Sequence, residues 1–404
     1  MESSRREFGA TVAAAAAIGT LSKPGLGKVA MPRNPFSKWR GFYLGSVGGS
    51  GEGFITHAAS LEDDLRLIVD WGFNAVRLRT DYTQWLTYTD KTPQGTPYPK
   101  DFMSVNEAAL AKIDEAVNQG VKNKLHVLLC MFHGPGYDVR DAARGKNSYT
   151  GPYNLWTDKS AQDAFAYYWG MLAKRYSGIP ADSLAFDLLN EPLRANFAHG
   201  VPPQRYRRIP TGLTNEVYAR VVKMAVDQIR RVSPDRPIFA EGLGEKMVTA
   251  DEVVPEIVPF EIGQSLHGYA PFQVTHFGSG ADDGNMPLPT WPYRMPDGSL
   301  FGRDELFKFY KPFGDLVARG IPVLCGEFGV SIETPNDVAL RYTTDLLDMF
   351  NQYGIGWLYL NLRGVAGTHG EWSAVLDSAR RDAPLETWNG HSLNRQILNI
   401  LQKH

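Results

Sequence analysis

The sequence has too few cysteines, too little net charge and too few long apolar runs for several classes of protein. Two of its 404 residues are cysteine, and the formal net charge is -2 at pH 7. A nucleic-acid partner normally requires a concentrated basic face, so this charge balance argues against one and favours a neutral ligand. The chain is 43% hydrophobic and 21% charged, which is typical of a globular protein rather than a disordered or fibrous one.

No run of residues is long enough to cross a bilayer, because a membrane-spanning helix needs about 20 apolar residues. Residues 9–21 form a shorter, Ala-rich run that follows Arg5 and Arg6 in the context Ser-Arg-Arg-x-Phe. This beginning resembles a twin-arginine export signal, and a frayed N-terminal helix is the alternative. We therefore expect residues 1–33 to be a signal and leader, residues 34–404 to be the folded domain, and the protein to be periplasmic or extracellular.

The two cysteines, Cys130 and Cys325, both lie inside predicted strands. An exported protein can form a disulfide between such residues. Cysteines in the interior of a strand are more often small, buried packing residues. We therefore expect free thiols.

The rest of the chain repeats one order of elements: amphipathic helix, glycine, apolar strand and loop. Apolar strands without strict alternation are typical of parallel strands that helices cover on both faces. Eight such strands in residues 34–404 predict a single α/β domain, a (β/α)8 TIM barrel with enlarged loops on its C-terminal face. The predicted strands are 40–45, 73–79, 125–132, 183–189, 236–241, 262–269, 321–329 and 355–362.

Polar side chains stand at the C-terminal ends of these strands. In a barrel, every parallel strand presents its C-terminal end to the same rim, so side chains at these positions gather at one open end of the barrel. Glu191 and Glu327, from the fourth and seventh strands, would then face each other across the barrel axis. The other polar residues at strand ends are Arg77, His133, Asn190, His267 and Tyr269.

Two facing carboxylates suit the hydrolysis of an acetal. A glycosidic bond breaks through a transition state that resembles an oxocarbenium ion, so one carboxyl donates a proton to the leaving oxygen while the other attacks or stabilises the anomeric carbon. Burial, neighbouring charges and mutual repulsion separate the pKa values of such a pair and so divide the roles. Arg77 could hold one carboxylate ionised, and Asn190 is placed to bind a sugar hydroxyl.

Five short motifs together resemble glycoside hydrolase family 5, the cellulase-type retaining glycosidases. They are NAVRLR, MFHGPG, FDLLNEP, LHGYAP and VLCGEFG, and the resemblance spans roughly residues 36–402. It implies that Glu191 is the acid/base, that Glu327 is the nucleophile, and that no cofactor or metal takes part. It also implies double-displacement hydrolysis of a β-glucan or a related β-linked oligosaccharide, polysaccharide or glycoside, with carboxyl groups about 5–5.5 Å apart. The residues implied to bind substrate or orient the nucleophile are Arg77, His133, Asn190, His267 and Tyr269.

One position departs from the family pattern. The family usually has a tryptophan near the end of strand eight as a stacking platform for the sugar, and this sequence has Leu360 there, three residues after Trp357. A leucine offers apolar contact but no π-face for the C–H groups of a sugar. We expect Trp372, in the loop that follows, to replace it. The departure leaves non-cellulosic β-glycosides open as substrates.

Two other classes of function are compatible with parts of the sequence. A metal-dependent barrel hydrolase would use histidine and carboxylate ligands, commonly with a His-x-His pair on the first strand, but residues 40–45 contain no histidine. A carbohydrate-binding barrel with weak or no catalysis would fit the missing tryptophan, but the presence of both Glu191 and Glu327 counts against it. The residue pattern does not distinguish endo from exo attack.

Overall fold

The computed structural model describes most of the chain beyond its first 33 residues. The compact unit that contains these residues runs from Pro32 to His404. The expected signal and leader, residues 1–33, lies outside the described residues. Among the described residues, no helix has the length and apolar character that crossing a membrane requires. The described ranges are 34–46, 61–92, 96–137, 153–198, 207–244, 250–279, 286–364 and 372–404.

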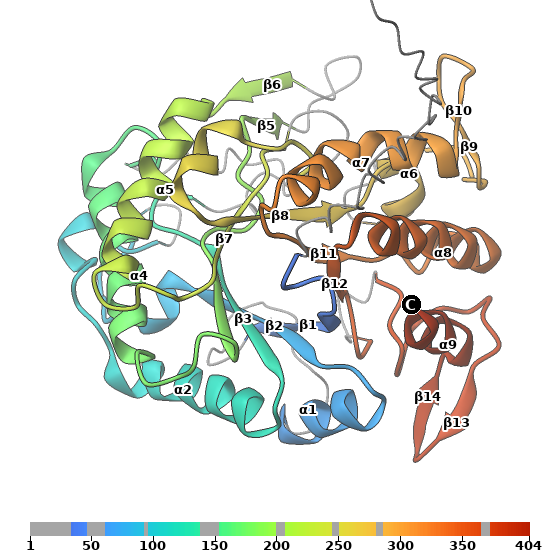
Figure 1. The fold of residues 1–404 in the computed structure, drawn as a ribbon, viewed down its shortest axis with the longest axis horizontal. Coiled ribbons are helices and arrows are strands. Elements are labelled where there is room, and N and C mark those ends of the chain that lie inside the picture. The colour runs from blue at the N-terminus through green and yellow to red at the C-terminus, as the bar shows by residue number, and fades with distance from the viewer. Residues whose placement is uncertain are drawn as a thin grey trace, which may run out of the picture. The chain divides into compact units, whose positions relative to one another are not determined.

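Eight parallel strands close into a barrel (Figure 1). The first strand pairs with the last, with Phe42 opposite Tyr359, and this pairing closes the ring. Each of the eight predicted strands has its counterpart, so the predicted (β/α)8 barrel is confirmed. The barrel strands are β1 (Arg40–Ser46), β2 (Ala75–Asp81), β3 (His126–His133), β4 (Leu184–Asp187), β7 (Ile238–Glu241), β8 (Gly263–Gly268), β11 (Val323–Phe328) and β12 (Gly356–Tyr359).

Helices connect the strands and surround the barrel (Figure 1). Their apolar faces pack on the outer faces of the strands, where residues such as Val76 and Val127 are fully buried. The helices are α1 (Leu61–Asp70), α2 (Glu107–Lys122), α4 (Lys159–Arg175), α5 (Asn215–Arg230), α6 (Phe272–Thr275), α7 (Arg303–Ala318), α8 (Asn336–Tyr353) and α9 (Arg395–Lys403). Short 3-10 helices are η1 (Tyr82–Trp85), η2 (Pro99–Asp101) and η3 (Pro255–Phe260).

Small two-stranded sheets occur in the connections. Among the described residues there are three: one follows the fourth strand of the barrel, one follows the sixth, and one precedes the last helix. These pairs are β5 (Ala195–Ala198) with β6 (Arg207–Pro210), β9 (Tyr293–Arg294) with β10 (Leu300–Phe301), and β13 (Glu386–Trp388) with β14 (His391–Leu393).

One predicted helix end is wrong. The order of helix, glycine and strand in the sequence predicts that α2 ends at Gly120, but the helix continues to Lys122, and Lys124 adopts the left-handed conformation with φ of 61°. A Cβ atom on Gly120 would lie 2.6 Å from a methyl carbon of Val127. The glycine therefore allows the helix to approach β3 closely. Gly354, by contrast, does end its helix, with φ of 68°.

Inward-facing side chains fill the barrel in layers, because successive residues of a strand point to opposite faces. The lower layer is apolar. On four of the strands, the residue two positions further along also faces inward, and these four residues form a polar layer. The apolar residues include Ala75, Leu128, Ala185 and Phe239. The corresponding members of the polar layer are Arg77, Cys130, Asp187 and Glu241.

Both cysteines are buried and unbridged, which confirms the expected free thiols. Cys130 belongs to the inward polar layer, whereas Cys325 packs in the large cluster between the barrel and its helices.

Candidate active site

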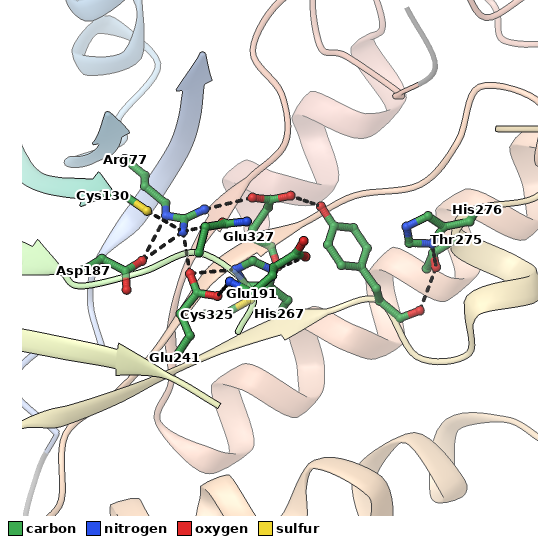
Figure 2. Close-up of polar contacts among 12 residues, drawn as sticks. Arg77, Cys130, Asp187, Glu191, Glu241, His267, Thr275, His276, Cys325 and Glu327 are labelled. Carbon is green, nitrogen blue, oxygen red and sulfur yellow. Dashed lines mark hydrogen bonds and ion pairs between the residues drawn. The ribbon is translucent and has the colours of Figure 1, made fainter. Parts of the chain in front are cut away.

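Arg77 lies at the centre of the polar layer and is fully buried (Figure 2). Its Nη2 atom donates to Glu241 Oε1 at 2.6 Å and to Asp187 Oδ2 at 3.0 Å. The same nitrogen contacts Asn190 Oδ1 at 2.9 Å, and Nη1 donates to Glu327 Oε2 at 2.8 Å. A buried cation is tolerated only where charges and hydrogen bonds compensate it. These contacts therefore fix β2 to β7 and β11, and to the end of β4.

Glu327 points into the barrel because β11 is irregular. Leu324 belongs to the inward apolar layer, so strict alternation would turn Gly326 inward and Glu327 outward. The pairing of β11 with β8 shifts register between Cys325 and Glu327, and such a bulge re-aims the following side chain. A Cβ atom on Gly326 would lie 3.5 Å from Arg77 Nε, so the glycine leaves room for the guanidinium group.

Two donors hold the carboxylate of Glu327. Arg77 binds one oxygen, and the hydroxyl of Tyr269 donates to the other at 2.7 Å. Burial raises the pKa of Glu327, the charges of His267 and Arg77 oppose this rise, and the nearby Glu191 carboxylate adds to it. Its side chain is 10% exposed, so the carboxylate reaches the open end of the barrel.

Glu191 follows β4 and has a left-handed backbone, with φ of 50°. Its backbone N–H donates to Glu241 Oε2 at 2.7 Å, and the hydroxyl of Tyr137 donates to its carbonyl oxygen. Its carboxylate Oε1 atom lies 2.9 Å from His267 Nδ1 (Figure 2). Non-glycine residues rarely adopt this backbone conformation, so contacts on both sides of the residue hold it.

His267 stands between carboxylates. Its Nδ1 atom contacts Glu191, and its Nε2 atom lies 3.2 Å from Glu241 Oε1. Burial disfavours a charged imidazole, but the charges of Glu241 and Glu327 and the contacts with Glu191 outweigh burial and raise the pKa of His267 well above its usual value. The surroundings therefore favour the charged imidazole, which is hydrogen-bonded to Glu191 through Nδ1 and in ionic contact with Glu241 through Nε2.

The two predicted catalytic carboxylates meet in one place. An oxygen of Glu191 and an oxygen of Glu327 lie within 4.8 Å of each other and of a His267 ring nitrogen. Retaining glycosidases have carboxyl groups about 5–5.5 Å apart, whereas inverting enzymes need roughly 6.5 Å or more. This close approach of the two oxygens fits a nucleophile that attacks directly better than the wider inverting arrangement.

His133 is held at the end of β3 by a neighbour on β2. Its Nδ1 atom is hydrogen-bonded to Asp81 Oδ1, and the ring of Phe132 lies edge-on to it. Asp81 also pairs with Arg79, whose guanidinium stacks 3.7 Å above the ring of Phe132. The predicted residue thus belongs to the same rim, on the side formed by β2 and β3.

Leu360 is fully packed and offers no surface to a ligand, since it is 1% exposed. It forms a cluster with Tyr43 and Phe132, and Trp372 packs against this cluster. The half-buried Trp372 ring also lies 5.3 Å from the Tyr269 ring. The structure therefore places Trp372 beside the tyrosine that binds Glu327.

Two groups of side chains have the composition of a metal site. They are Cys130, Asp187 and Glu241, and Glu191, His267 and Glu327. Arg77 already occupies the first group, because its Nη2 atom lies within 3.0 Å of an atom of each of the three. In the second group, hydrogen bonds already engage both oxygens of Glu327 and the Nδ1 atom of His267. Neither group presents the free, deprotonated donors that a metal ion requires.

Glu241 and Asp187 contact the predicted site residues, although the sequence had not singled them out as site residues. Glu241 ends β7 at the same rim as the other strand-end residues, so the signal that identified those residues could have identified it. Asp187 is the one ionisable residue within the apolar β4 strand. Burial and the neighbouring Glu241 raise the pKa of Asp187 to about 8.

Comparison with known proteins agrees with this geometry. Residues 32–364 match the model of the family described as Cellulase (glycosyl hydrolase family 5). The chain is 24% identical over 364 residues to Endoglucanase C of Acetivibrio thermocellus, which covers 85% of this chain and 90% of that protein. It is also 24% identical over 294 residues to Cellodextrinase A of Ruminococcus flavefaciens, which covers 73% of this chain and 76% of that protein.

Solved structures share the fold. A crystal structure described as a glycoside hydrolase superposes with a TM-score of 0.74 at 29% identity and covers 91% of this chain and 99% of its own. Cel5A of Thermotoga maritima, solved with mannotriose, superposes with a TM-score of 0.63 at 18% identity, covering 91% of this chain and 98% of its own. The family match over most of the chain, the barrel and the paired carboxylates agree, and the chain belongs to glycosyl hydrolase family 5 as a retaining glycoside hydrolase.

Proposed function

We propose that Glu327 is the nucleophile and Glu191 the acid/base of a double displacement. In the first step a Glu327 oxygen attacks the anomeric carbon, the glycosidic C–O bond breaks, and the Glu191 proton passes to the leaving oxygen. In the second step water attacks the anomeric carbon, gives a proton to Glu191, and releases the Glu327 carboxylate. The observation that carries this proposal is the separation of less than 4.8 Å between the two carboxylates.

The surroundings of the two carboxylates support this division of roles. Glu327 receives hydrogen bonds on both oxygens, from Arg77 and from Tyr269, which orient it and favour its ionised form. Glu191 contacts His267 through one oxygen, and its side chain is 15% exposed, more than that of Glu327. The more exposed carboxyl exchanges protons with the leaving group and water, as an acid/base must.

We propose a β-linked glucan or its oligosaccharides as the substrate. The names of the relatives, endoglucanase and cellodextrinase, support this choice. Within the site, Arg77 holds Asn190 through its side-chain oxygen, so the Asn190 amide nitrogen is the group that can donate to a sugar hydroxyl. Trp372, which packs against Leu360 and Tyr269, supplies the aromatic face that Leu360 lacks. His133 contributes a polar group at the end of β3.

A second candidate substrate class is a β-glycoside other than cellulose. The observation that favours it is the wall of the site, where the buried Leu360 replaces the usual aromatic platform and the Arg79 guanidinium covers Phe132. A panel of β-glucans, β-mannans and aryl β-glycosides distinguishes the two classes. Highest kcat/KM on β-1,4-glucan oligosaccharides supports the first, and highest kcat/KM on another β-glycoside supports the second.

Covalent trapping tests the catalytic assignment. A 2-deoxy-2-fluoro β-glycoside with a good leaving group slows the second step, so the glycosyl-enzyme accumulates. Peptide mapping by mass spectrometry should then find one label, on the peptide that contains Glu327. A label on Glu191, or none despite turnover of the parent glycoside, would contradict the proposal.

We also propose that residues 1–33 direct export of the protein. The paired Arg5 and Arg6 before an Ala-rich run support this. Fusion of residues 1–33 to a reporter should carry it out of the cytoplasm, and the R5K/R6K variant should retain it inside. Equal export of both fusions would contradict a twin-arginine signal.

A further inference from the structure

Glu241 is a fully buried carboxylate that none of the catalytic steps above uses. Its Oε1 atom accepts from Arg77 Nη2 at 2.6 Å and lies 3.2 Å from His267 Nε2. Its Oε2 atom accepts from the backbone N–H of Glu191 at 2.7 Å. One carboxylate thus contacts three residues of the site, each of which comes from a different element.

Each of these contacts reaches a different part of the reaction centre. Arg77 also binds Glu327, and His267 also binds the carboxylate of Glu191. The third contact holds the backbone of Glu191 itself. Because Glu241 is 0% exposed, a substrate cannot touch it, and any effect on the reaction must pass through these neighbours.

The charges in this cluster are mutually consistent. Burial disfavours the ionised form of Glu241, but the charges of His267 and Arg77 outweigh burial and lower its pKa. An ionised carboxylate accepts hydrogen bonds only. Arg77 and the backbone N–H of Glu191 donate to it, and the His267 ring is in ionic contact with it. The Glu241 side chain thus contacts the His267 ring, and the His267 ring contacts the Glu191 side chain.

The backbone of Glu191 needs such support. A left-handed backbone is strained for a non-glycine residue, so it persists only where contacts fix it. Glu241 holds the N–H of Glu191, and Tyr137 holds its carbonyl oxygen. Loss of one holder would allow the residue to relax and carry its carboxyl away from the leaving oxygen.

We propose that Glu241 is the positioning residue of the acid/base, which holds Glu191 and His267 in the arrangement from which Glu191 delivers its proton to the leaving group. This inference rests on the proposed roles of Glu191 and Glu327. It differs from a purely structural role, because it assigns the effect of Glu241 to one step, the transfer of a proton to the leaving oxygen.

The test compares two leaving groups in the full-length protein. The variant E241Q keeps the shape of the side chain, but its amide group turns one of the two acceptor atoms into a donor. We would measure kcat/KM on phenyl β-cellobioside, whose leaving group needs a proton, and on 2,4-dinitrophenyl β-cellobioside, whose leaving group departs without one. For both substrates, kcat/KM reports the reaction up to and including the first chemical step, in which the leaving group departs.

The expected result for E241Q is a loss of about 100-fold on the phenyl glycoside, since a general acid typically contributes 10²–10⁴-fold. On the dinitrophenyl glycoside the expected loss is less than about tenfold, because Arg77 and Glu327 are disturbed only indirectly. E241D, which keeps the charge but is one methylene shorter, should show the same gap between substrates and serves if E241Q does not fold. Circular dichroism and thermal melting establish the fold of each variant.

C130A is the matched control. Cys130 also contacts Arg77 Nη2 from inside the barrel, at 3.0 Å, but it contacts neither Glu191 nor His267 in the described hydrogen bonds. Its losses should therefore be equal on the two substrates. E191A is the reference, and it should show the largest gap.

Equal losses on both substrates for E241Q and E241D, together with a gap for E191A, would overturn the proposal and leave Glu241 a structural residue. If E191A itself shows no gap, the assignment of Glu191 as the acid fails instead. The two failures are therefore distinguishable.

Discussion

The hydroxyl of Tyr269 donates a 2.7 Å hydrogen bond to Glu327 Oε1, and both groups are buried. Burial and the charge of Glu327 raise the pKa of Tyr269 well above its usual value, so the phenol keeps its proton and remains a donor. The backbone carbonyl of Tyr269 accepts from Thr275, which anchors the residue at the end of β8. The hydrogen bond stabilises the ionised form of Glu327, the form that attacks.

The Tyr269→Phe variant should shift the acid limb of the pH profile to higher pH. Glu327 must be ionised to attack, and its pKa is already raised, so kcat/KM falls as the pH drops through that value. Removing the donor raises the pKa of Glu327 further. The measurement is kcat/KM against pH on an aryl β-glycoside. Y353F is the control, because its hydroxyl donates to Phe307 between two outer helices, and its profile should match the wild type. An unshifted acid limb in Y269F would contradict this account.

The Arg77→Met variant should lose both activity and stability. It leaves Asp187, Glu241 and Glu327 without their common cation, and breaking a buried ion pair typically costs about 3–5 kcal/mol. Urea unfolding measures this change in the free energy of unfolding. In the control R395M, only the exposed pair with Glu386 is lost, and the cost should stay below about 1 kcal/mol. Similar values for the two variants would disprove the central role of Arg77.

The Trp372→Ala variant should weaken catalysis without loss of the fold. A lost aromatic contact of about 1.4 kcal/mol corresponds to a tenfold lower kcat/KM. The control is W388A, since Trp388 belongs to β13 and its described ring contact is with Trp71, which directly follows α1. Steady-state kinetics on β-glucan oligosaccharides give the comparison. Unchanged kinetics in W372A would remove this residue as the replacement platform.

The Gly120→Ala variant should destabilise the barrel by about 1–3 kcal/mol, because its new methyl group would overlap the side chain of Val127. G178A is the matched control, since a Cβ atom there meets nothing within 4 Å. Thermal melting of both variants provides the measurement. A G120A melting temperature at or above that of G178A would show that the packing explanation is wrong.

The barrel could be predicted because its strands are apolar runs bounded by glycines and amphipathic helices, which are local patterns. The gathering of the site residues could be predicted as well, because parallel strands bring their polar C-terminal ends to one rim of the barrel. The bulge that turns Glu327 inward could not be predicted, because it depends on the register of β11 with β8. The end of α2 was predicted wrongly at Gly120, because the sequence does not distinguish a glycine that allows close packing from a glycine that ends a helix.

Asp187 and Glu241 were not predicted as site residues for a related reason. Each is a single acidic residue in an apolar strand, and its meaning depends on Arg77, which lies more than a hundred residues away along the chain. The left-handed backbone of Glu191 likewise depends on distant partners, Tyr137 and Glu241. Only the folded chain brings these groups together.

The most direct test of the central claim is the stereochemistry of azide products from E327A and E191A on a 2,4-dinitrophenyl β-glycoside. In E327A, azide takes the place of the nucleophile and attacks opposite the leaving group, so the product should be the α-glycosyl azide. In E191A, azide attacks the glycosyl-enzyme from the face that the leaving group vacated, so the product should be the β-glycosyl azide. Proton NMR distinguishes the two anomers. The reverse pairing of variants and products, or near-normal hydrolysis by E327A, would contradict the assignment of the two carboxylates.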